Sequence, residues 1–168
     1  MSRKLFAVVG DPVSHSLSPL IHNRWIAEAG LDAHYSAYHL QSLNAAADIR
    51  ALASQYSGLN VTLPHKIAAL EAAASSTPEA RAIGAANTLA RENGAWVAHN
   101  TDVAGFADAL AIAVGSPTPG LRVVMIGAGG AARAAVASLA ASGARLAIVN
   151  RSLANAKTLA ADLAPTAD

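Results

Sequence analysis

Two side chains, Lys66 and Asp102, stand where polar segments lead into predicted helices, and together they could exchange a proton with a substrate. Lys66 follows a predicted strand that ends at Thr62 and a turn imposed by Pro64. Ligand crevices of α/β sheets open at the carboxyl ends of strands. A lysine there can act as a general acid or base if partial burial lowers its pKa. A carboxylate beside it would orient the lysine and share a substrate hydroxyl proton.

Both residues also have structural explanations, and the spacing alone favours these. Lys66 could be a solvated side chain at a helix start, and Asp102 could be an ordinary helix cap. The N-terminus of a helix repels cations, however, so this is a poor position for a lysine with a purely structural role.

Three further polar residues could bind a ligand. Ser16 and Ser18 lie in the loop after the first strand, and with the main-chain amides of the following helix they could hold a carboxylate. The alternative is a capping serine at Ser18, with Pro19 as the first helical residue, in a polar loop. Asn87 follows a run of small residues and enters a strand, so it either satisfies main-chain groups or faces a ligand.

A glycine-rich turn between a strand and an alanine-rich helix is typical of a dinucleotide-binding βαβ unit. The strand 122–126 leads into Gly127-Ala128-Gly129-Gly130-Ala131, and Ala132 occupies the third glycine position of the fingerprint. The next strand, 144–149, ends on Asn150-Arg151-Ser152 and not on an acid. An acid would accept a hydrogen bond from the ribose 2′-hydroxyl of NAD, whereas an arginine suits a 2′-phosphate. This pattern predicts NADP and an oxidoreductase.

The elements that would position these residues alternate between strands and helices, which predicts an α/β fold with a mostly parallel sheet. A Pro/Gly-rich linker at 115–120 separates an N-terminal domain, 1–116, from an incomplete Rossmann-type domain, 117–168. The second domain has two predicted strands and two helices, fewer than a doubly wound sheet needs, so we expect a truncated portion of a longer protein. A short natural variant that completes its sheet with a partner chain is the alternative.

The predicted strands are 4–9, 34–40, 58–62, 88–90, 96–98, 122–126 and 144–149. The predicted helices are 18–30, 42–54, 66–74, 78–83 and 101–114, followed by one helix after each of the last two strands.

The composition excludes several classes of protein. The chain has 168 residues, of which 53% are hydrophobic and 14% charged, and a net charge of +1, so we expect a globular protein that binds neither nucleic acid nor membrane. It has no cysteine, and its six histidines lack metal-ligand spacing, so we expect no metal. No apolar run approaches the ~20 residues that cross a bilayer, and the first run is too short for a signal peptide. We therefore expect a cytoplasmic protein.

Taken in order, six segments resemble the shikimate dehydrogenase family, which includes shikimate/quinate dehydrogenases. The resemblance covers essentially the whole chain. The segments are Ser16-Leu17-Ser18-Pro19, Asn60-Val61-Thr62-Leu63-Pro64-His65-Lys66, Gly84-Ala85-Ala86-Asn87-Thr88, Asn100-Thr101-Asp102-Val103-Ala104-Gly105, Gly127-Ala128-Gly129-Gly130 and Asn150-Arg151-Ser152.

The resemblance implies an N-terminal substrate domain, an NADP domain and the reversible reduction of 3-dehydroshikimate to shikimate in aromatic amino-acid biosynthesis. By this resemblance, Ser16 and Ser18 bind the substrate carboxylate, and Lys66 and Asp102 form the acid/base pair. The ring hydroxyls would be bound by Asn60, Thr62, Asn87 and Asp102. The turn from Gly127 to Ala131 would cradle the pyrophosphate, and Asn150, Arg151 and Ser152 would hold the 2′-phosphate and adenosine. We expect a monomer or a homodimer.

The chain departs from the family pattern in two places. Ala98 stands where the family usually has a glycine. The family's C-terminal part, which completes the nucleotide sheet and returns a glutamine-bearing helix to the substrate pocket, is absent, so we expect this chain to be inactive or nearly so. The alternatives are a quinate/shikimate dehydrogenase with relaxed cofactor use and a truncated, non-catalytic shikimate-binding fragment.

Overall fold

The computed structural model describes residues 3–116 and 119–164. Contacts within the chain divide it into two compact units: unit 1 consists of residues 1–81 and 85–100, and unit 2 of residues 82–84 and 101–168. The elements in chain order are β1 (Lys4–Gly10), α1 (Ser18–Glu28), β2 (Ala33–His39), α2 (Ala45–Ala51), the 3-10 helix η1 (Leu52–Ser54), β3 (Gly58–Val61), α3 (Lys66–Ala72), β4 (Ser75–Ser76), α4 (Pro78–Ile83), β5 (Thr88–Glu92), β6 (Ala95–His99), α5 (Asp102–Val114), β7 (Arg122–Ile126), α6 (Gly130–Ala141), β8 (Arg145–Val149) and α7 (Leu153–Leu163).

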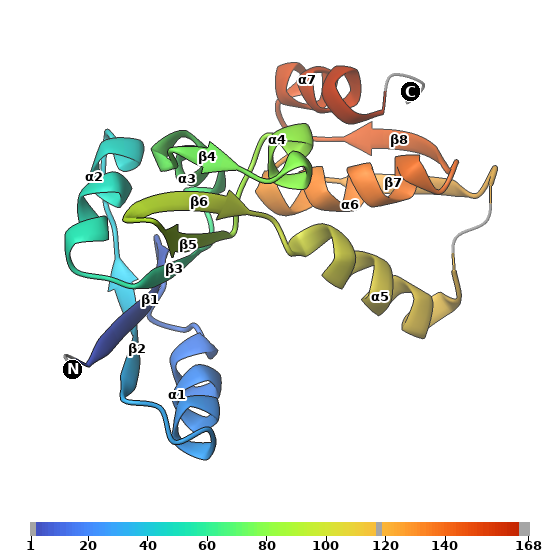
Figure 1. Cartoon of the computed structure of the whole chain (residues 1–168). Helices are drawn as coiled ribbons and strands as arrows, with labels where there is room; N and C mark the ends of the chain where they lie inside the picture. The colour runs from blue at the N-terminus through green and yellow to red at the C-terminus, as the bar shows by residue number, and fades with distance from the viewer. Residues whose placement is uncertain (1–2, 117–118, 165–168) are drawn as a thin grey trace. The chain divides into compact units, whose positions relative to one another are not determined.

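Unit 1 is built on a six-stranded sheet with the strand order β2-β1-β3-β5-β6-β4 (Figure 1). Strand β1 pairs in parallel with β2 and β3, and β4 pairs in parallel with β6. Strand β5 runs antiparallel to β3 and β6. The predicted α/β fold with a mostly parallel sheet is confirmed. The predicted hairpin is also present, because Asn93 and Gly94, with φ of 50° and 85°, form the two-residue turn between β5 and β6.

Strand β1 packs on both faces because successive side chains of a strand point to opposite sides. Ala7 and Val9 belong to the main core cluster, which includes Ile49 of α2 and Ala69 of α3. Val8 lies on the other face, in a cluster that the α1 side chain of Ile26 joins. Figure 1 shows α2 and α3 on one side of this sheet and α1 on the other. The buried sheet thereby holds the carboxyl end of β1 and of β3 in fixed positions.

Some local features of unit 1 differ from the sequence prediction. The predicted helix 42–54 is divided into α2 and η1, and α2 begins after Asn44, whose side chain caps it by accepting a hydrogen bond from the Ala47 amide at 3.4 Å. Ser18 is the first residue of α1 and not its cap; the cap position is Leu17, which makes no side-chain capping bond. Strand β4 is two residues long, which is too short to leave a pattern in the sequence.

Unit 2 contains a parallel pair of strands, β7 and β8, with α5, α6 and α7. Its core cluster includes Val136 and Leu139 of α6 and Leu159 of α7, and Val123 of β7 packs against it. Arg133 of α6 forms an ion pair of 2.9 Å with Asp162 of α7. The side chains on the other side of the strand pair are exposed, namely Val124, Ile126 and Val149.

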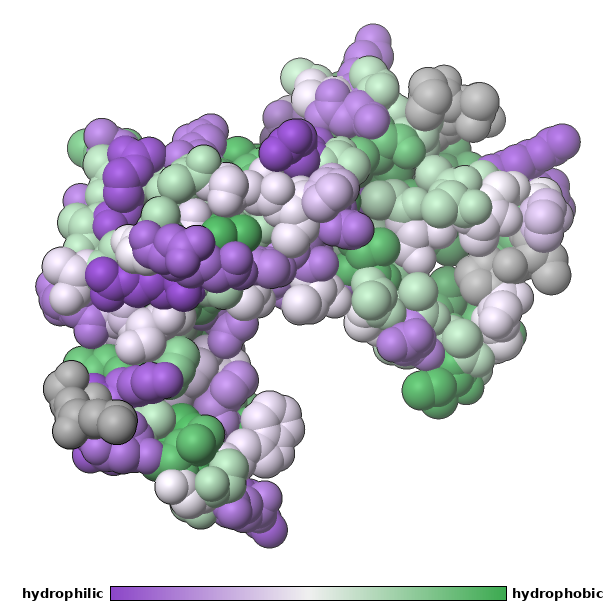
Figure 2. Space-filling model, viewed as in Figure 1, coloured by the Kyte–Doolittle hydropathy of each residue, from purple (hydrophilic) through white to green (hydrophobic). Residues whose placement is uncertain are grey.

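Helix α5 is grouped with unit 2 by its contacts, so the structural division falls between Asn100 and Thr101. The predicted linker at 115–120 follows this helix, and its residues 117 and 118 lie outside the described residues. Figure 2 shows hydrophobic surface over the carboxyl end of α5, where Ile112 and Val114 are largely exposed.

Candidate active site

The carboxyl ends of β1 and β3 meet at Gly10 and Thr62. The Thr62 amide donates to the Val9 carbonyl at 2.8 Å, and the Asp11 amide donates to the Leu63 carbonyl at 3.0 Å. A Cβ atom at Gly10 would lie 2.5 Å from Cγ2 of Thr62 and 3.0 Å from the Leu63 oxygen. Glycine is therefore the residue that lets the end of β1 approach the loop carrying Thr62, one of the predicted site residues.

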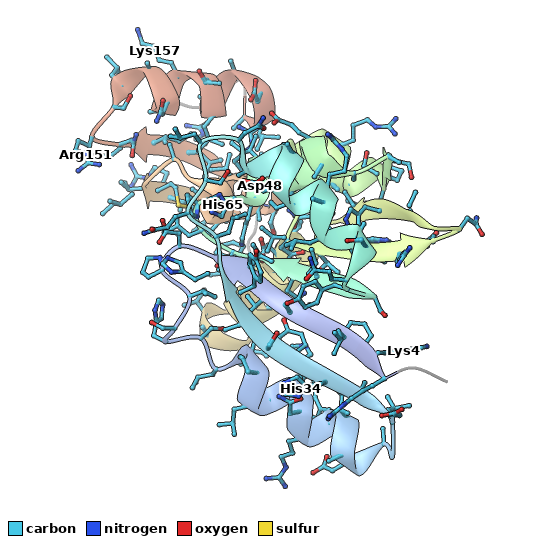
Figure 3. The ribbon with its side chains drawn as sticks, turned by 90° about the vertical axis from the view of Figure 1, so that its left-hand side faces the viewer. Lys4, His34, Asp48, His65, Arg151 and Lys157 are labelled. Atoms are coloured by element: carbon cyan, nitrogen blue, oxygen red, sulfur yellow. The ribbon has the colours of Figure 1, made fainter. Side chains whose placement is uncertain are left out.

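Lys66 is held at the first position of α3 by its neighbours along the chain. His65 is only 7% exposed, and its Nε2 atom lies 2.7 Å from the Leu40 carbonyl oxygen (Figure 3 labels this residue). The Lys66 carbonyl accepts a hydrogen bond of 2.8 Å from the Ala86 amide. This bond places the segment that contains Asn87 next to the start of α3. His65 is accordingly a core histidine.

A chain of side-chain hydrogen bonds joins β2, β3 and β5 at the centre of unit 1. The Tyr35 hydroxyl donates to Oδ1 of Asn60 at 2.7 Å, and Nδ2 of Asn60 donates to Oγ1 of Thr88 at 3.1 Å. The Thr88 hydroxyl in turn donates to Oδ1 of Asn87 at 3.1 Å. Two of the predicted site residues, Asn60 and Asn87, therefore belong to one polar network.

Tyr35 lies in this network with only 3% of its surface exposed. Burial raises the pKa of the Tyr35 hydroxyl to about 12, and a side-chain hydrogen bond with Ser18 acts in the opposite direction. The hydroxyl therefore stays protonated at neutral pH. Ser18 is linked to Ser16 as well, because the Ser18 amide donates to the Ser16 hydroxyl oxygen at 3.3 Å.

A cleft of about 470 Å³ borders this network on the α1 side of the sheet. Apolar side chains such as Phe6 and Ile26 form part of its wall, and Tyr35, Asn60 and Thr88 contribute polar atoms. Small-molecule sites in proteins commonly combine an apolar wall with a few convergent polar groups. Three other predicted site residues do not line the cleft but adjoin residues that do. Ser18 acts on Tyr35, Asn87 accepts a hydrogen bond from Thr88, and Thr62 follows β3 and bonds through its main chain to Val9.

Lys66 and Asp102 belong to different units of the structure. Lys66 begins α3 in unit 1, and Asp102 is the first residue of α5 in unit 2, as its predicted place in the first helical turn requires. Their pairing stays a prediction. Asn100, which precedes Asp102 by two positions, is fixed in unit 1 because its Nδ2 donates to the Ala85 carbonyl at 2.9 Å.

The predicted nucleotide-binding residues lie together in unit 2, at the carboxyl ends of β7 and β8. Gly127 has a φ of 113°, which an L side chain rarely adopts, and its amide donates to the Val149 carbonyl at 2.8 Å. Gly129 occupies the cap position of α6, a helix of twelve residues that begins at Gly130. The turn 127–131 therefore leads directly into a helix N-terminus, where main-chain amides and the helix dipole favour a phosphate.

The segment after β8 is ordered by its own polar groups. Nδ2 of Asn150 donates to the Ser152 carbonyl at 2.9 Å, and the Ser152 hydroxyl caps α7 by accepting from the Asn155 amide at 3.4 Å. Arg151, between them, is exposed and projects from the loop (Figure 3). These groups fit a dinucleotide with a 2′-phosphate. The glycine turn and the helix N-terminus can bind the pyrophosphate, and the exposed guanidinium can bind the 2′-phosphate.

Sequence reasoning missed Tyr35 and Thr88 as members of the polar network. Tyr35 lies in an alternating strand and has the pattern of an ordinary core aromatic residue, so nothing local marks its hydroxyl as a site group. Thr88 follows Asn87 directly, and its place at the start of a strand could have indicated a shared site.

These features define an α/β protein of two units. One unit has an apolar cleft with a few polar groups, and the other has the beginning of a dinucleotide-binding βαβ arrangement. No helix of the described residues is long and apolar enough to cross a membrane, and no group of three or more potential metal ligands occurs among them.

Comparison with known families agrees with the description of two α/β units. The model "Shikimate dehydrogenase substrate binding domain" matches residues 8–89, and "Shikimate / quinate 5-dehydrogenase" matches residues 109–167.

The chain belongs to the shikimate dehydrogenase family. It is 46% identical over 165 residues to the shikimate dehydrogenase (NADP(+)) of Hyphomonas neptunium, covering 97% of this chain and 60% of the relative. It is 42% identical over 168 residues to the enzyme of the same name from Bacillus cereus, covering 99% of this chain and 60% of that relative. The chain thus spans about 60% of the length of these curated relatives.

Solved structures give the same result. The shikimate dehydrogenase from Aquifex aeolicus superimposes with a TM-score of 0.87 at 34% identity, covering 95% of this chain and 60% of that one. The shikimate 5-dehydrogenase from Thermus thermophilus, solved in complex with NADP(H) and shikimate, superimposes with a TM-score of 0.81 at 37% identity, covering 95% of this chain and 60% of that one.

Proposed function

We propose that the protein to which this chain belongs catalyses the reversible, NADP-dependent reduction of 3-dehydroshikimate to shikimate. The polar network at the carboxyl side of β3 carries the proposal, because it joins predicted substrate residues from separate segments beside a cleft of about 470 Å³. The relatives that match nearly the whole chain bear the name shikimate dehydrogenase (NADP(+)), which supports this substrate and this cofactor.

In this proposal residues 1–116 form the substrate-binding and catalytic domain, and residues 117–168 form part of the NADP-binding domain. Ser16 and Ser18 bind the substrate carboxylate. The ring hydroxyls are bound by Asn60, Thr62, Asn87 and Asp102. A site with several oriented hydrogen-bond partners rejects analogues that lack the matching hydroxyls, since its own polar groups would be left unpaired.

NADP, when bound, accepts or supplies the hydride. The residues of this chain handle the proton: Lys66 donates it to the carbonyl oxygen as negative charge develops there, and Asp102 orients the lysine and the substrate hydroxyl. The pyrophosphate is held by the glycine-rich turn, which consists of Gly127, Ala128, Gly129, Gly130 and Ala131. Asn150, Arg151 and Ser152 hold the adenosine and its 2′-phosphate. We further propose a cytoplasmic protein that is a monomer or a homodimer.

NADPH formation from shikimate and NADP tests the proposal, with quinate and NAD as parallel substrates. We expect turnover with shikimate and NADP from a protein extended beyond residue 168, and little or none from the 168-residue chain. Substitution of Lys66 by alanine in the extended protein should lower kcat by at least about 100-fold with a smaller change in KM. Equal turnover of quinate and use of NAD would favour the relaxed quinate/shikimate enzyme.

A non-catalytic shikimate-binding fragment is the second candidate for the polypeptide itself. The exposed side chains Val124, Ile126 and Val149 on one face of the β7–β8 pair favour it, because a nucleotide-binding sheet is normally covered on both faces. Shikimate binding without NADPH formation by the chain and by the extended protein would support this second candidate and refute the enzyme.

A further inference from the structure

Tyr35 is held in place by two side chains of α1. The side-chain amide of Asn23 makes two hydrogen bonds to the Tyr35 main chain: Oδ1 accepts from the amide at 2.9 Å and Nδ2 donates to the carbonyl at 2.7 Å. The His22 ring stacks on the Tyr35 ring, with 4.2 Å between centroids and 12° between planes. The His22 Nδ1 atom also lies 2.9 Å from the Ser18 carbonyl oxygen. Helix α1 therefore fixes both the backbone and the ring of Tyr35.

The Asn60 side-chain amide has a hydrogen-bond partner on each side, and the Tyr35 hydroxyl is one of them. An asparagine side chain can be turned over with little change in shape, but its oxygen accepts and its nitrogen donates. The Tyr35 hydroxyl donates to the Asn60 oxygen at 2.7 Å, and this arrangement leaves the Asn60 nitrogen to donate toward Thr88 at 3.1 Å. In a turned amide the Asn60 oxygen would face Thr88, whose hydroxyl already donates to Asn87 at 3.1 Å, so Thr88 could keep only one of these two bonds. Because burial raises the pKa of Tyr35 to about 12, its hydroxyl stays protonated and can donate to the Asn60 oxygen across the neutral range.

Tyr35 also connects the two halves of the proposed substrate site. Its hydroxyl donates to Asn60, which we assign to a ring hydroxyl, and the Ser18 side chain, which we assign to the carboxylate, acts to lower the pKa of that hydroxyl. The three side chains come from α1, β2 and β3, which are separate segments of the chain. A single phenol therefore interacts with groups that we assign to opposite ends of one small ligand.

We propose that Tyr35 is a positioning residue of the substrate site, whose hydroxyl holds the Asn60 side chain in place. This inference rests on the proposed function for its substrate, shikimate. It assigns a role to a residue that the sequence pattern alone places in the apolar core.

The effect of the Tyr35 hydroxyl on the Asn60 side chain can be tested without a ligand. In the ¹⁵N-labelled 168-residue chain, Tyr35→Phe keeps the ring that stacks on His22 and removes only the hydroxyl. We expect the Asn60 side-chain NH₂ signals to shift and their exchange with water to accelerate about three- to tenfold, as for the loss of one hydrogen bond. Tyr38→Phe is the matched control, because Tyr38 lies on the same strand and contacts Tyr56 in the main core cluster. It should leave the Asn60 signals unchanged.

The effect on the ligand is measured by titrating the same variants with shikimate. Tyr35→Phe should weaken shikimate binding about three- to tenfold, and Tyr38→Phe should not. A double-mutant cycle separates positioning from packing. If Tyr35 acts through Asn60, adding Tyr35→Phe to Asn60→Ala should weaken binding no further than Asn60→Ala does alone.

Unchanged Asn60 signals in Tyr35→Phe would overturn the inference, and so would additive losses in the cycle. Normal shikimate affinity in a folded Tyr35→Phe chain would also overturn it, while leaving the proposed function intact. A folded chain that binds no shikimate in its unmodified form would count against the proposed function and against any role of Tyr35 in substrate binding; the Asn60 signals would then show only whether Tyr35 positions the Asn60 side chain.

Discussion

The side-chain amide of Asn23 pairs with the main chain of Tyr35 as a neighbouring strand would, through bonds of 2.9 and 2.7 Å. Tyr35 lies on β2, the edge strand of the six-stranded sheet. Unpaired main-chain groups on an edge strand invite pairing with another chain. Asn23 satisfies those groups at the residue whose hydroxyl reaches the polar network, so one side chain both covers the edge and positions Tyr35.

Asn23→Ala should lower the free energy of unfolding of unit 1 by about 1–3 kcal/mol, because it leaves the amide and carbonyl of Tyr35 without their partner. Urea unfolding followed by tryptophan fluorescence measures this, since Trp25 and Trp96 both lie in unit 1. Asn155→Ala, at an exposed position of α7, is the control and should change this transition little. Equal stability of Asn23→Ala and the unmodified chain would show that these two bonds contribute nothing net.

Gly10→Ala should destabilise unit 1 by at least about 2 kcal/mol, because the new methyl group would lie 2.5 Å from Cγ2 of Thr62. The same substitution in a Thr62→Ser background should cost less, since serine lacks that methyl group. The shift in the urea midpoint measures both effects. If Gly10→Ala costs the same in the two backgrounds, its destabilisation does not arise from contact with Thr62.

The stability of unit 1 should depend on Tyr35 at alkaline pH. Burial raises the pKa of Tyr35 to about 12, above its ordinary value of 10.0, so the folded state prefers the protonated hydroxyl. This stabilisation is complete below pH ~10 and is lost as the pH rises through about 12, with a limit of roughly 2–3 kcal/mol. Unfolding free energies measured across this range should fall for the unmodified chain and for Tyr38→Phe. In Tyr35→Phe this part of the fall should vanish, and its persistence would assign the effect to another group.

Arg151→Ala should weaken the binding of nucleotides that carry a 2′-phosphate. An arginine offers two parallel charged hydrogen bonds to a phosphate, so we expect about a 10-fold or larger loss for adenosine 2′-phosphate and little change for adenosine 5′-phosphate. Calorimetric titration of the 168-residue chain with each nucleotide provides the comparison. Arg145→Ala removes the same charge from the amino end of β8 and should leave both affinities nearly unchanged. An equal loss for the two nucleotides in Arg151→Ala would remove this residue from 2′-phosphate recognition.

Much of the fold could be predicted because its local signals agree. The strand β1 is a short apolar run, the Asn93-Gly94 pair adopts the positive φ values that its hairpin needs, and the turn at Gly127 separates a strand from a helix. The sequence also placed Lys66 at a helix start and Asp102 in the first turn of the next long helix, and both positions are confirmed.

The remaining features depend on contacts between distant segments, which no local pattern records. Tyr35 lies in a segment where apolar and polar residues alternate as in an ordinary strand. Only the fold brings its hydroxyl to Asn60, which is 25 residues away in the sequence. The role of Asn23 is hidden for the same reason, because an asparagine in a helix looks like a surface residue until its strand partner is known. Ser18 was predicted to cap α1 from a Ser-Pro pair, but the helix begins one residue earlier, at Ser18 itself.

Titration of the 168-residue chain with shikimate tests the central claim most directly, with quinate and cyclohexanecarboxylate as comparison ligands. The account predicts that shikimate binds to unit 1, that cyclohexanecarboxylate binds at least about tenfold more weakly because it lacks the ring hydroxyls, and that Asn60→Ala removes most of this difference. A folded chain that binds the two ligands equally, or binds neither, would contradict the assignment of the polar network around Asn60 as a shikimate site.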